Sequence, residues 1–189
     1  VREDLTPSKI MTRKAFENAI VLNSAIGGSS NAPLHINAIA RHLGVNLDIT
    51  QWEKIGFNIP LLVNMQPVGK YLGEDFHRAG GVPAVMNILL INDKLHRESL
   101  NVNGKTVFEN YSNCSVKDSK IIQDFQNPMK KIAGFLILKG NIFESAVMKT
   151  SAISEKFHQN YLSTPGRENI VELKAIVFEG PEDYIKRIN

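Results

Sequence analysis

A glycine-rich turn stands directly before a helical pattern in the stretch "AIGGSSNAPLHINAIARH". The turn consists of Gly27, Gly28, Ser29, Ser30 and Asn31. Glycine lets a backbone approach a ligand closely, and the N–H groups at a helix N-terminus favour negative charge. The turn lacks both the Gly-Lys-Ser/Thr ending of a P-loop and the G-x-G-x-x-G spacing of a dinucleotide site. Its pattern is compatible with an anion site or with a capped helix start whose small residues allow close packing.

Two histidines, His35 and His42, follow the turn on one face of the helix that is expected there. The ring of His35 lies in the first helical turn, where it would be able to face a pocket. The ring of His42 lies at the other end, where a cation interacts favourably with the helix dipole. No third residue joins them at a spacing typical of a metal site, so the sequence predicts no metal here.

Three further positions carry side chains suited to acid–base chemistry, namely Glu74, Asp75 and His77. Acidic residues are also favoured in the first turn of any helix, and this structural explanation is the preferred one. A role in proton transfer would require a buried neighbour that shifts a pKa, which a sequence does not reveal.

A third group, Lys149, Thr150 and Ser151, follows an apolar run that has the composition of a strand. The ends of strands next to turns are frequent ligand sites, although lysine and threonine are also ordinary surface residues there. No Ser/His/Asp or Cys/His nucleophile arrangement can be assigned, so the residues alone indicate only a possible anion site.

The composition is that of an ordinary globular protein, with 43% hydrophobic and 22% charged residues among 189. The net charge of +3 is weakly basic and its lysines and arginines are scattered, so nucleic-acid binding is not expected. The one cysteine, Cys114, excludes an internal disulfide and suits a reducing, cytoplasmic compartment. No apolar run approaches the ~20 residues of a membrane helix. Because "VREDLTPSKIM" lacks an initiator Met, we expect a fragment.

Hydrophobic periodicity predicts mainly helices in the first part of the chain and mainly strands in the last part. Thr6 and Pro7 predict a helix start, and Ala15, Phe16, Ala19 and Ile20 recur at helical spacing, which predicts a helix over residues 12–24. Further helices are expected at residues 34–43, 48–56, 82–90 and 154–161, and strands at 59–65, 100–110, 133–141, 145–153 and 173–180. In the helix expected at 34–43, an apolar stripe of Leu34, Ala38, Ile39 and Leu43 ends at Gly44. The segment 111–130 turns polar and loses periodicity, and is the best candidate for a domain boundary.

Five blocks together resemble the dihydroxyacid and sugar-acid dehydratases, a family of iron–sulfur lyases. The blocks are "LTPSKIMTRKAFENAIVLNSAIGGSSNAPLHINAIARHLGV", "IPLLVNMQPVGKYLGEDFHRAGGVPAVMNILL", "NGKTVFEN", "AGFLILKGNIFESAVMKTSAIS" and "VFEGPEDY", in that order. The segment Ile142-Phe143-Glu144-Ser145 is similar to the sugar-acid branch, which favours arabonate or xylonate as substrate. The resemblance implies that residues 1–110 end an α/β N-terminal domain, that 111–130 are a linker, and that 131–189 begin a mostly β, barrel-type domain.

The resemblance also implies a chemistry for the full-length enzyme. The family removes water from a 2,3-dihydroxy acid, using a 2Fe–2S cluster as Lewis acid, Mg²⁺ at the carboxylate end and a serine as base. Its cluster and magnesium motifs lie upstream of the region that this chain resembles, and its serine motif lies downstream. We therefore expect no catalytic residue and no metal ligand in this chain, Cys114 included. A full-length enzyme would be a cytoplasmic homo-oligomer, a dimer or tetramer, with a small sugar acid as its partner and no nucleic acid or membrane.

The resemblance carries over a substrate-binding region to this chain. Gly28, Ser29, Ser30, Asn31 and His35 are expected near the active site between the domains, and Lys149, Thr150 and Ser151 are candidates for the same cleft. Two other functions stay open. One is the branched-chain dihydroxyacid dehydratase, and the other is a catalytically inactive, truncated module that binds anions or partners.

Overall fold

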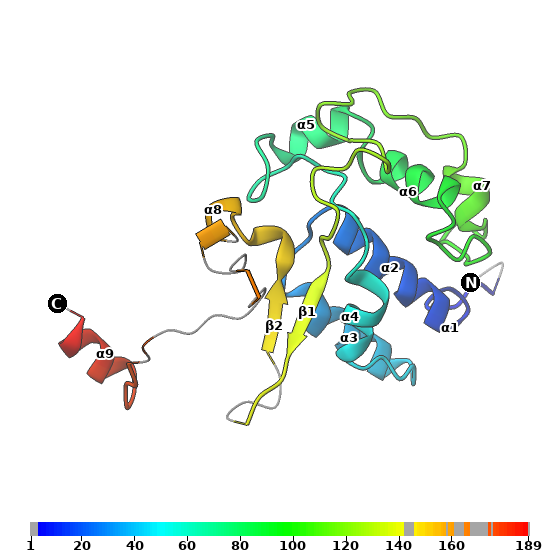
Figure 1. Cartoon of the computed structure of the whole chain (residues 1–189). Coiled ribbons are helices and arrows are strands. Elements are labelled where there is room, and N and C mark those ends of the chain that lie inside the picture. The colour runs from blue at the N-terminus through cyan, green and yellow to red at the C-terminus, as the bar shows by residue number, and fades with distance from the viewer. Residues whose placement is uncertain are drawn as a thin grey trace. The chain divides into compact units, whose positions relative to one another are not determined.

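The structure is a computed structural model that describes residues 4–141, 146–157, 159–160, 165–166, 174 and 176–188 (Figure 1). The chain divides into two units, Val1–Ala152 and Ile153–Asn189. The four residues 142–145, which suggest the sugar-acid branch, lie outside the described residues.

The first unit begins with helix α1, Pro7–Ile10, and helix α2, Arg13–Ala25. Helix α2 begins where the sequence predicts, because the Thr12 hydroxyl caps it by accepting a hydrogen bond from the Ala15 N–H at 3.4 Å. The whole of α2 is regular and amphipathic, so the predicted helix over residues 12–24 is confirmed.

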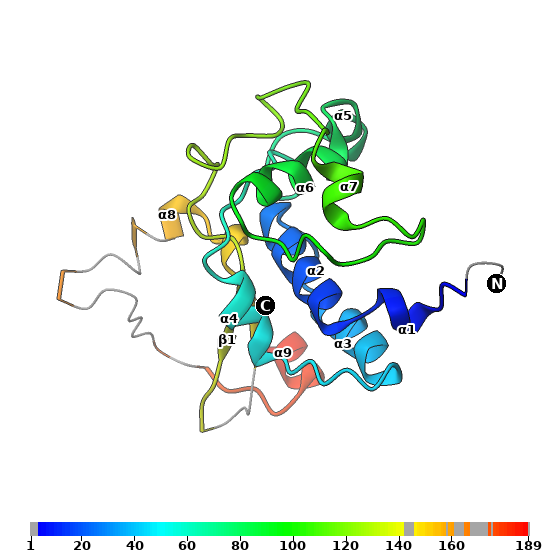
Figure 2. The same cartoon turned by 90° about the vertical axis from the view of Figure 1, so that its right-hand side faces the viewer.

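Helix α2 is buried on two sides, because it contributes residues to two hydrophobic clusters. Val21 and Ala25 belong to one cluster, while Phe16 and Ile20 belong to the other. The first cluster is completed by Ile59, Leu62, Val63, Phe76, Ala79, Ala84, Val85, Leu89, Ile121 and Ile122, and the second by Ala40, Leu47, Trp52 and Phe135. Both views show α2 running between the helices that carry these residues (Figures 1 and 2).

Helix α3, Ala32–His42, confirms the predicted helix, but a different face of it is buried. Leu34 is 67% exposed, Ile39 is 43% exposed and Ala38 is also exposed, so the predicted stripe is wrong as a packing face for all its members except Leu43. The indole N–H of Trp52 donates to Asn37 Oδ1 at 2.9 Å and turns the neighbouring side of α3 inward. The inward side chains are Pro33, Ile36, Ala40 and Leu43.

Four more helices of the first unit follow in sequence. They are α4, Thr50–Gly56; α5, Gly73–Arg78; α6, Gly81–Ile91; and α7, Val107–Tyr111. The pair Gly80 and Gly81, with φ values of 121° and 59°, separates α5 from α6.

The predicted strand at residues 100–110 is wrong in its second half. Leu100 and Thr106 form an isolated antiparallel bridge around a turn in which Gly104 has a φ of 76°. Beyond the bridge the chain turns into α7, because Thr106 and Glu109 cap each other's backbone N–H groups. This reciprocal cap satisfies the first N–H groups of a helix, which outweighs the β-like composition of the segment.

The predicted strand at residues 59–65 is buried as expected but is not a regular strand. Leu61, Leu62 and Val63 are fully buried. Their segment makes isolated bridges only, Leu61 with Lys130, Val63 with Ile122 and Met65 with Tyr71. The partner segment is irregular, so the hydrogen bonds do not continue into a ladder.

The two described strands, β1 (Phe135–Leu138) and β2 (Ala146–Lys149), confirm the predicted apolar runs at 133–141 and 145–153. They pair antiparallel, with Phe135 opposite Lys149. Strand β1 packs on α4, where the Trp52 and Phe135 rings meet edge to face at 5.8 Å and the Ile137 N–H donates to Glu53 Oε2 at 3.2 Å. A short 3₁₀ helix, Thr150–Ala152, comes directly after β2.

The second unit contains helix α8, Glu155–Phe157, inside the predicted helix at 154–161, and helix α9, Pro181–Arg187. The predicted strand at 173–180 lies partly outside the described residues, and its described residues 176–178 form no strand. The barrel-type domain and the division at residues 110 and 130 stay predictions. Within the described ranges, no helix is long and apolar enough to span a membrane.

A charged network ties the start of α2 to the chain that comes after α6. Glu17 accepts a hydrogen bond from Arg13 Nε at 2.7 Å and bonds His96 Nε2 at 2.6 Å. Arg13 also donates to Asn46 O at 2.6 Å and to Gln51 Oε1 at 2.8 Å. Burial raises the pKa of Glu17, but the hydrogen bonds and charges of Arg13 and His96 outweigh it, so the pKa lies below its ordinary value of 4.5.

This lowered pKa predicts how stability depends on pH. A carboxylate with a folded-state pKa below its unfolded value stabilises the fold above the unfolded pKa of 4.5, and the stabilisation is lost as the pH falls through the folded pKa. We expect Glu17→Gln to lower the free energy of unfolding by ~1–2 kcal/mol near neutral pH. In chemical denaturation the variant and the parent should converge at acidic pH. Glu98→Gln, at an exposed position, is the control, and an equal effect of both variants would contradict the prediction.

Candidate functional site

The glycine-rich turn is held by the last turn of α2. The Gly27 N–H donates to Ser24 O at 3.1 Å, and the Gly28 N–H donates to Asn23 O at 2.8 Å. Gly27 has a φ of 64°, which glycine adopts at little cost. A Cβ on Gly27 would also meet Leu61 Cδ1 at 2.9 Å. Glycine is therefore required here both for the backbone conformation and for the close approach of Leu61.

The second half of the turn starts α3. The Asn31 N–H donates to Ser29 Oγ at 3.1 Å, whereas the Asn31 side chain makes no capping hydrogen bond among the described residues. Ser29, Ser30, Asn31 and His35 are all exposed. The predicted helix start is thus present, but its N-cap residue Asn31 makes no side-chain cap, and the Ser29 hydroxyl instead closes the turn that comes before the helix.

Lys149 joins the two predicted candidate groups across 122 positions of sequence. At the end of β2, its ammonium Nζ donates to the Gly27 carbonyl at 2.7 Å. Burial lowers the pKa of Lys149 from its ordinary value of 10.5, because a half-buried ammonium loses part of its hydration. The site therefore combines a partly desolvated cation with a turn whose glycines are closely approached by the Leu61 and Asn23 side chains.

Two buried polar atoms beside this contact lack hydrogen-bond partners among the described residues. Ser151 is fully buried, and its Oγ is 4.0 Å from the position that a Cβ on Gly27 would take. Asn23 packs its side-chain amide against Gly28, and its Nδ2 is buried and unpaired. Unpaired buried polar atoms are rare because each costs about 1–3 kcal/mol, so two of them beside one turn are an unusual feature of this region.

Thr150 and Lys130 hold the neighbouring backbone in place. The Thr150 hydroxyl donates to Gly134 O at 2.6 Å, which ties the end of β2 to the residue before β1. Lys130 Nζ donates to Ser151 O at 2.6 Å. Both contacts are structural, so Thr150 is a support of the site and its predicted binding role remains a prediction.

Sequence reasoning misses both Asn23 and Lys130. The signal for Asn23 is a polar side chain beside the buried face of α2, two positions before the buried Ala25. No comparable signal marks Lys130, whose contact with Ser151 arises from tertiary packing. The structure brings three of the predicted residues close to Gly27, namely Gly28, Lys149 and Ser151. Among the described contacts, none connects Lys149 with Ser29, Ser30 or His35.

The other titratable candidates have ordinary structural roles. Asp75 Oδ2 accepts a hydrogen bond from the Leu72 N–H at 3.0 Å, and so caps the start of α5. Glu74 pairs with Arg78 on the same helix. Cys114 is half-buried, with its thiol donating to Asn110 O at 3.7 Å. Within the described part of the chain, no group of three His, Cys, Asp or Glu side chains is arranged to hold a metal.

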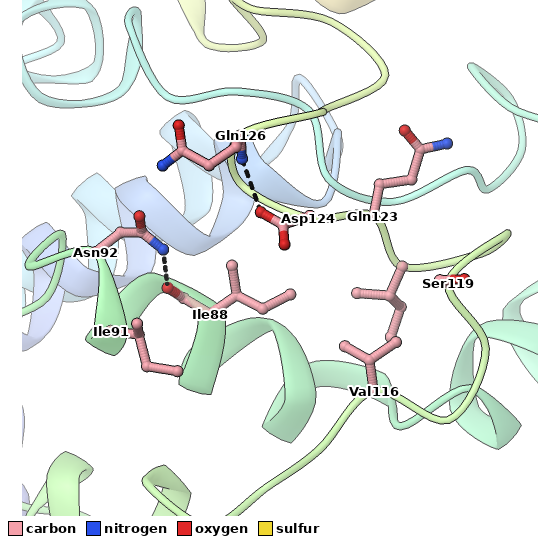
Figure 3. A pocket seen from close by; sticks show the side chains of 9 residues that line it. Ile88, Ile91, Asn92, Val116, Ser119, Gln123, Asp124 and Gln126 are labelled. Carbon is pink, nitrogen blue, oxygen red and sulfur yellow. Dashed lines mark hydrogen bonds between the residues drawn. The ribbon is translucent and has the colours of Figure 1, made fainter.

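A separate cavity of about 410 Å³ lies between α6 and the segment 116–126 (Figure 3). Its apolar part consists of Ile88, Ile91, Val116 and Ile122. Its polar side chains are partly occupied, since Asn92 donates to Ile88 O at 2.8 Å and Asp124 accepts from the Gln126 N–H at 2.8 Å. None of the candidate site residues lines this cavity, so it is not part of the site around Gly27.

Comparison with known proteins gives two family matches. Residues 1–110 match the N-terminal model of the dihydroxy-acid/6-phosphogluconate dehydratases, and residues 120–189 match the C-terminal model. Gly27 lies in the first matched region and Lys149 lies in the second. The hydrogen bond between them therefore connects the two matched regions within one unit of the structure.

Individual relatives have three different activities in their names. The chain is 52% identical over 187 residues to a D-xylonate dehydratase of Caulobacter vibrioides, covering 99% of this chain and 31% of that protein. It is 40% identical to an L-arabinonate dehydratase of Rhizobium leguminosarum bv. trifolii, covering all of this chain and 31% of the relative. It is 43% identical to a dihydroxy-acid dehydratase of Microcystis aeruginosa, covering all of this chain and 32% of the relative. The chain thus spans about a third of the length of the curated relatives that it matches.

The turn geometry predicts different costs for two glycine substitutions. Gly27→Ala and Gly44→Ala both place a side chain at positive φ, 64° and 70°, but only Gly27 has a neighbour within 4 Å. We expect Gly27→Ala to lower the free energy of unfolding by about 1–3 kcal/mol more than Gly44→Ala does, because Leu61 must also move. Denaturant unfolding of the two variants measures this difference, and equal losses would contradict the close packing at Gly27.

Because burial lowers the pKa of Lys149, we expect this side chain to titrate below the ordinary lysine value of 10.5. A selectively labelled 13Cε NMR titration should give a midpoint below that value. Because the folded state then binds fewer protons than the unfolded state, stability should rise as the pH increases from the folded midpoint towards 10.5. Lys149→Met should abolish this rise, whereas Lys139→Met, at an exposed position beyond β1, should keep it.

Proposed function

Because the chain belongs to the dihydroxy-acid/6-phosphogluconate dehydratase family, we propose that it is part of a hydro-lyase that converts a sugar acid, such as xylonate or arabonate, to its 2-keto-3-deoxy acid. The identity of 52% to a D-xylonate dehydratase supports a sugar acid as the substrate class. On the structural side the proposal is carried by the contact of Lys149 with Gly27. This contact holds the partly buried Lys149 ammonium in place as a cation for the carboxylate of such a substrate.

Each group of the site has a role that matches a sugar acid. The Lys149 ammonium binds the carboxylate, since charge-assisted hydrogen bonds are the strongest available to it. The unpaired Ser151 Oγ and Asn23 Nδ2 bind substrate hydroxyls, for which a hydroxyl and an amide are suitable partners. The outer part of the proposed site is formed by the exposed residues Ser29, Ser30, Asn31 and His35, which follow Gly28 along the chain.

The described residues do not fit the metal groups that the family resemblance implies. A 2Fe–2S cluster is held by several thiolates, and this chain contains one cysteine, whose thiol already donates to Asn110 O. Magnesium is held by carboxylates, and the described part of the chain gathers no such set. We therefore assign the cluster ligands, the magnesium ligands and the serine base to other parts of a full-length enzyme, and assign this chain binding and orientation only.

A branched-chain dihydroxyacid is the alternative substrate. The 43% identity to the dihydroxy-acid dehydratase of Microcystis aeruginosa favours it as the second candidate. Both substrates carry a carboxylate for Lys149, but a sugar acid has further hydroxyl groups. Those hydroxyls would use the unpaired Ser151 and Asn23 atoms, which is why the sugar acid is preferred.

Further properties of the full-length enzyme come from the family resemblance alone. We propose that it is a cytoplasmic homo-oligomer, a dimer or tetramer, in which residues 1–110 end an α/β domain and 131–189 begin a mostly β, barrel-type domain. Size-exclusion chromatography with light scattering tests the oligomeric state.

The substrate proposal predicts the activity of a full-length enzyme that contains this chain. D-Xylonate or L-arabonate should be dehydrated with a higher kcat/KM than dihydroxyisovalerate. Lys149→Met should lower kcat/KM for the sugar acid on the order of 10- to 100-fold, mainly through KM, because a charged hydrogen bond to the carboxylate is lost. The assay is the formation of 2-keto acid.

Two results would contradict this proposal. Turnover of dihydroxyisovalerate alone would assign the chain to the alternative substrate. If Lys149→Met lowered kcat and left KM unchanged, Lys149 would not be a substrate-binding residue. Lys139→Met is the matched control and should leave both parameters unchanged. An absence of activity on all three acids would favour the third possibility, an inactive module that binds anions or partners.

A further inference from the structure

A second cavity, of about 220 Å³, lies among α2, α6, α7 and the segment that precedes α7. The views agree that these three helices lie side by side (Figures 1 and 2). One face of α2 provides its floor with Ala15, Asn18, Ala19 and Leu22. The remaining lining side chains are Val82, Met86, Ser99, Leu100, Asn101, Val107 and Tyr111. None of these residues belongs to the site around Gly27.

Two polar atoms in the lining have no hydrogen-bond partner among the described residues. Ser99 is only 7% exposed, and its Oγ is buried and unpaired. The Nδ2 of Asn101, two positions along the chain, is also buried and unpaired. Asn18, in contrast, is fully engaged, because its amide donates to His96 O at 3.1 Å and accepts from the His96 N–H at 2.7 Å. The unpaired hydroxyl and amide are thus a specific feature of this cavity and indicate a ligand with a hydrogen-bonding group.

The cavity is uncharged. Every lining side chain is neutral, and the adjacent ionisable residues Glu17 and His96 hydrogen-bond each other instead. A carboxylate inside would be an unpaired buried charge, which is strongly unfavourable. The cavity therefore differs in kind from the site around Gly27, where Lys149 supplies a cation.

We propose that this cavity binds a small uncharged ligand that has an apolar body and a carbonyl oxygen. The carbonyl oxygen accepts hydrogen bonds from the Ser99 hydroxyl and the Asn101 amide, both of which can donate. The apolar body packs on Leu22, Val82 and Met86. The volume suits this class of ligand, because an apolar cavity of about 150 Å³ is large enough for benzene.

Benzamide is the probe for this proposal, and benzoate is its isostere with a negative charge. Titration of the 15N-labelled chain should give saturable amide shifts at Ser99, Asn101 and Tyr111 with benzamide, at a dissociation constant of roughly 1 mM as expected for a small fragment. Benzoate should bind this cavity on the order of tenfold more weakly or not at all. No saturable shift with benzamide, or equal binding of benzoate, would overturn the proposal.

Two serine variants test the hydrogen bond independently. Ser99→Ala should weaken benzamide binding on the order of tenfold, because the carbonyl oxygen loses a donor. Ser119→Ala, at an exposed serine of the other cavity, should leave the affinity unchanged. The circular dichroism of both variants should match the parent. Unchanged affinity in a folded Ser99→Ala variant would also overturn the proposal.

Discussion

The burial of α2 on two sides is the constraint on which the rest of the first unit depends. Val21 and Ala25 belong to one hydrophobic cluster, and Phe16 and Ile20 belong to the other, so α2 cannot rotate without disrupting both. The end of α2 also fixes a second segment of the chain. The Ala25 carbonyl accepts from the Leu62 N–H at 2.8 Å, which anchors the buried segment 59–65 beside the glycine-rich turn. The position of Gly27 is therefore a consequence of core packing.

The same helix borders two chemically different environments. Near its C-terminus, the turn at Gly27 meets Lys149 and gains a cation. Along its side, Ala15 and Ala19 leave room for a neutral cavity, because their small side chains do not fill the space towards α6. Helix α2 thus borders a charged and an uncharged environment a few turns apart, and we propose a different class of ligand for each.

Local signals in the sequence predict the parts of the fold that depend on local interactions. The Thr12 cap, the end of α3 before Gly44 and the apolar runs of β1 and β2 are all evident from the residues themselves. The buried face of α3 is not, because it is set by the distant Trp52, which hydrogen-bonds Asn37. The residues alone give the candidate site as two groups, which the family resemblance assigns to one cleft, and tertiary packing shows that Lys149 reaches Gly27. Asn23 escapes prediction because its polar side chain resembles that of any exposed helical residue.

The contact of Lys149 with Gly27 also explains why neither matched region suffices for the site. Gly27 lies in the region that matches the N-terminal family model, and Lys149 and Ser151 lie in the region that matches the C-terminal one. Without the turn, the Lys149 ammonium would lose its carbonyl acceptor, and without β2 the turn would lose its cation. A half-buried ammonium is costly unless it has partners. The two regions must therefore be packed together before the Lys149 ammonium has its carbonyl acceptor, and the proposed binding of a carboxylate depends on the same hydrogen bond.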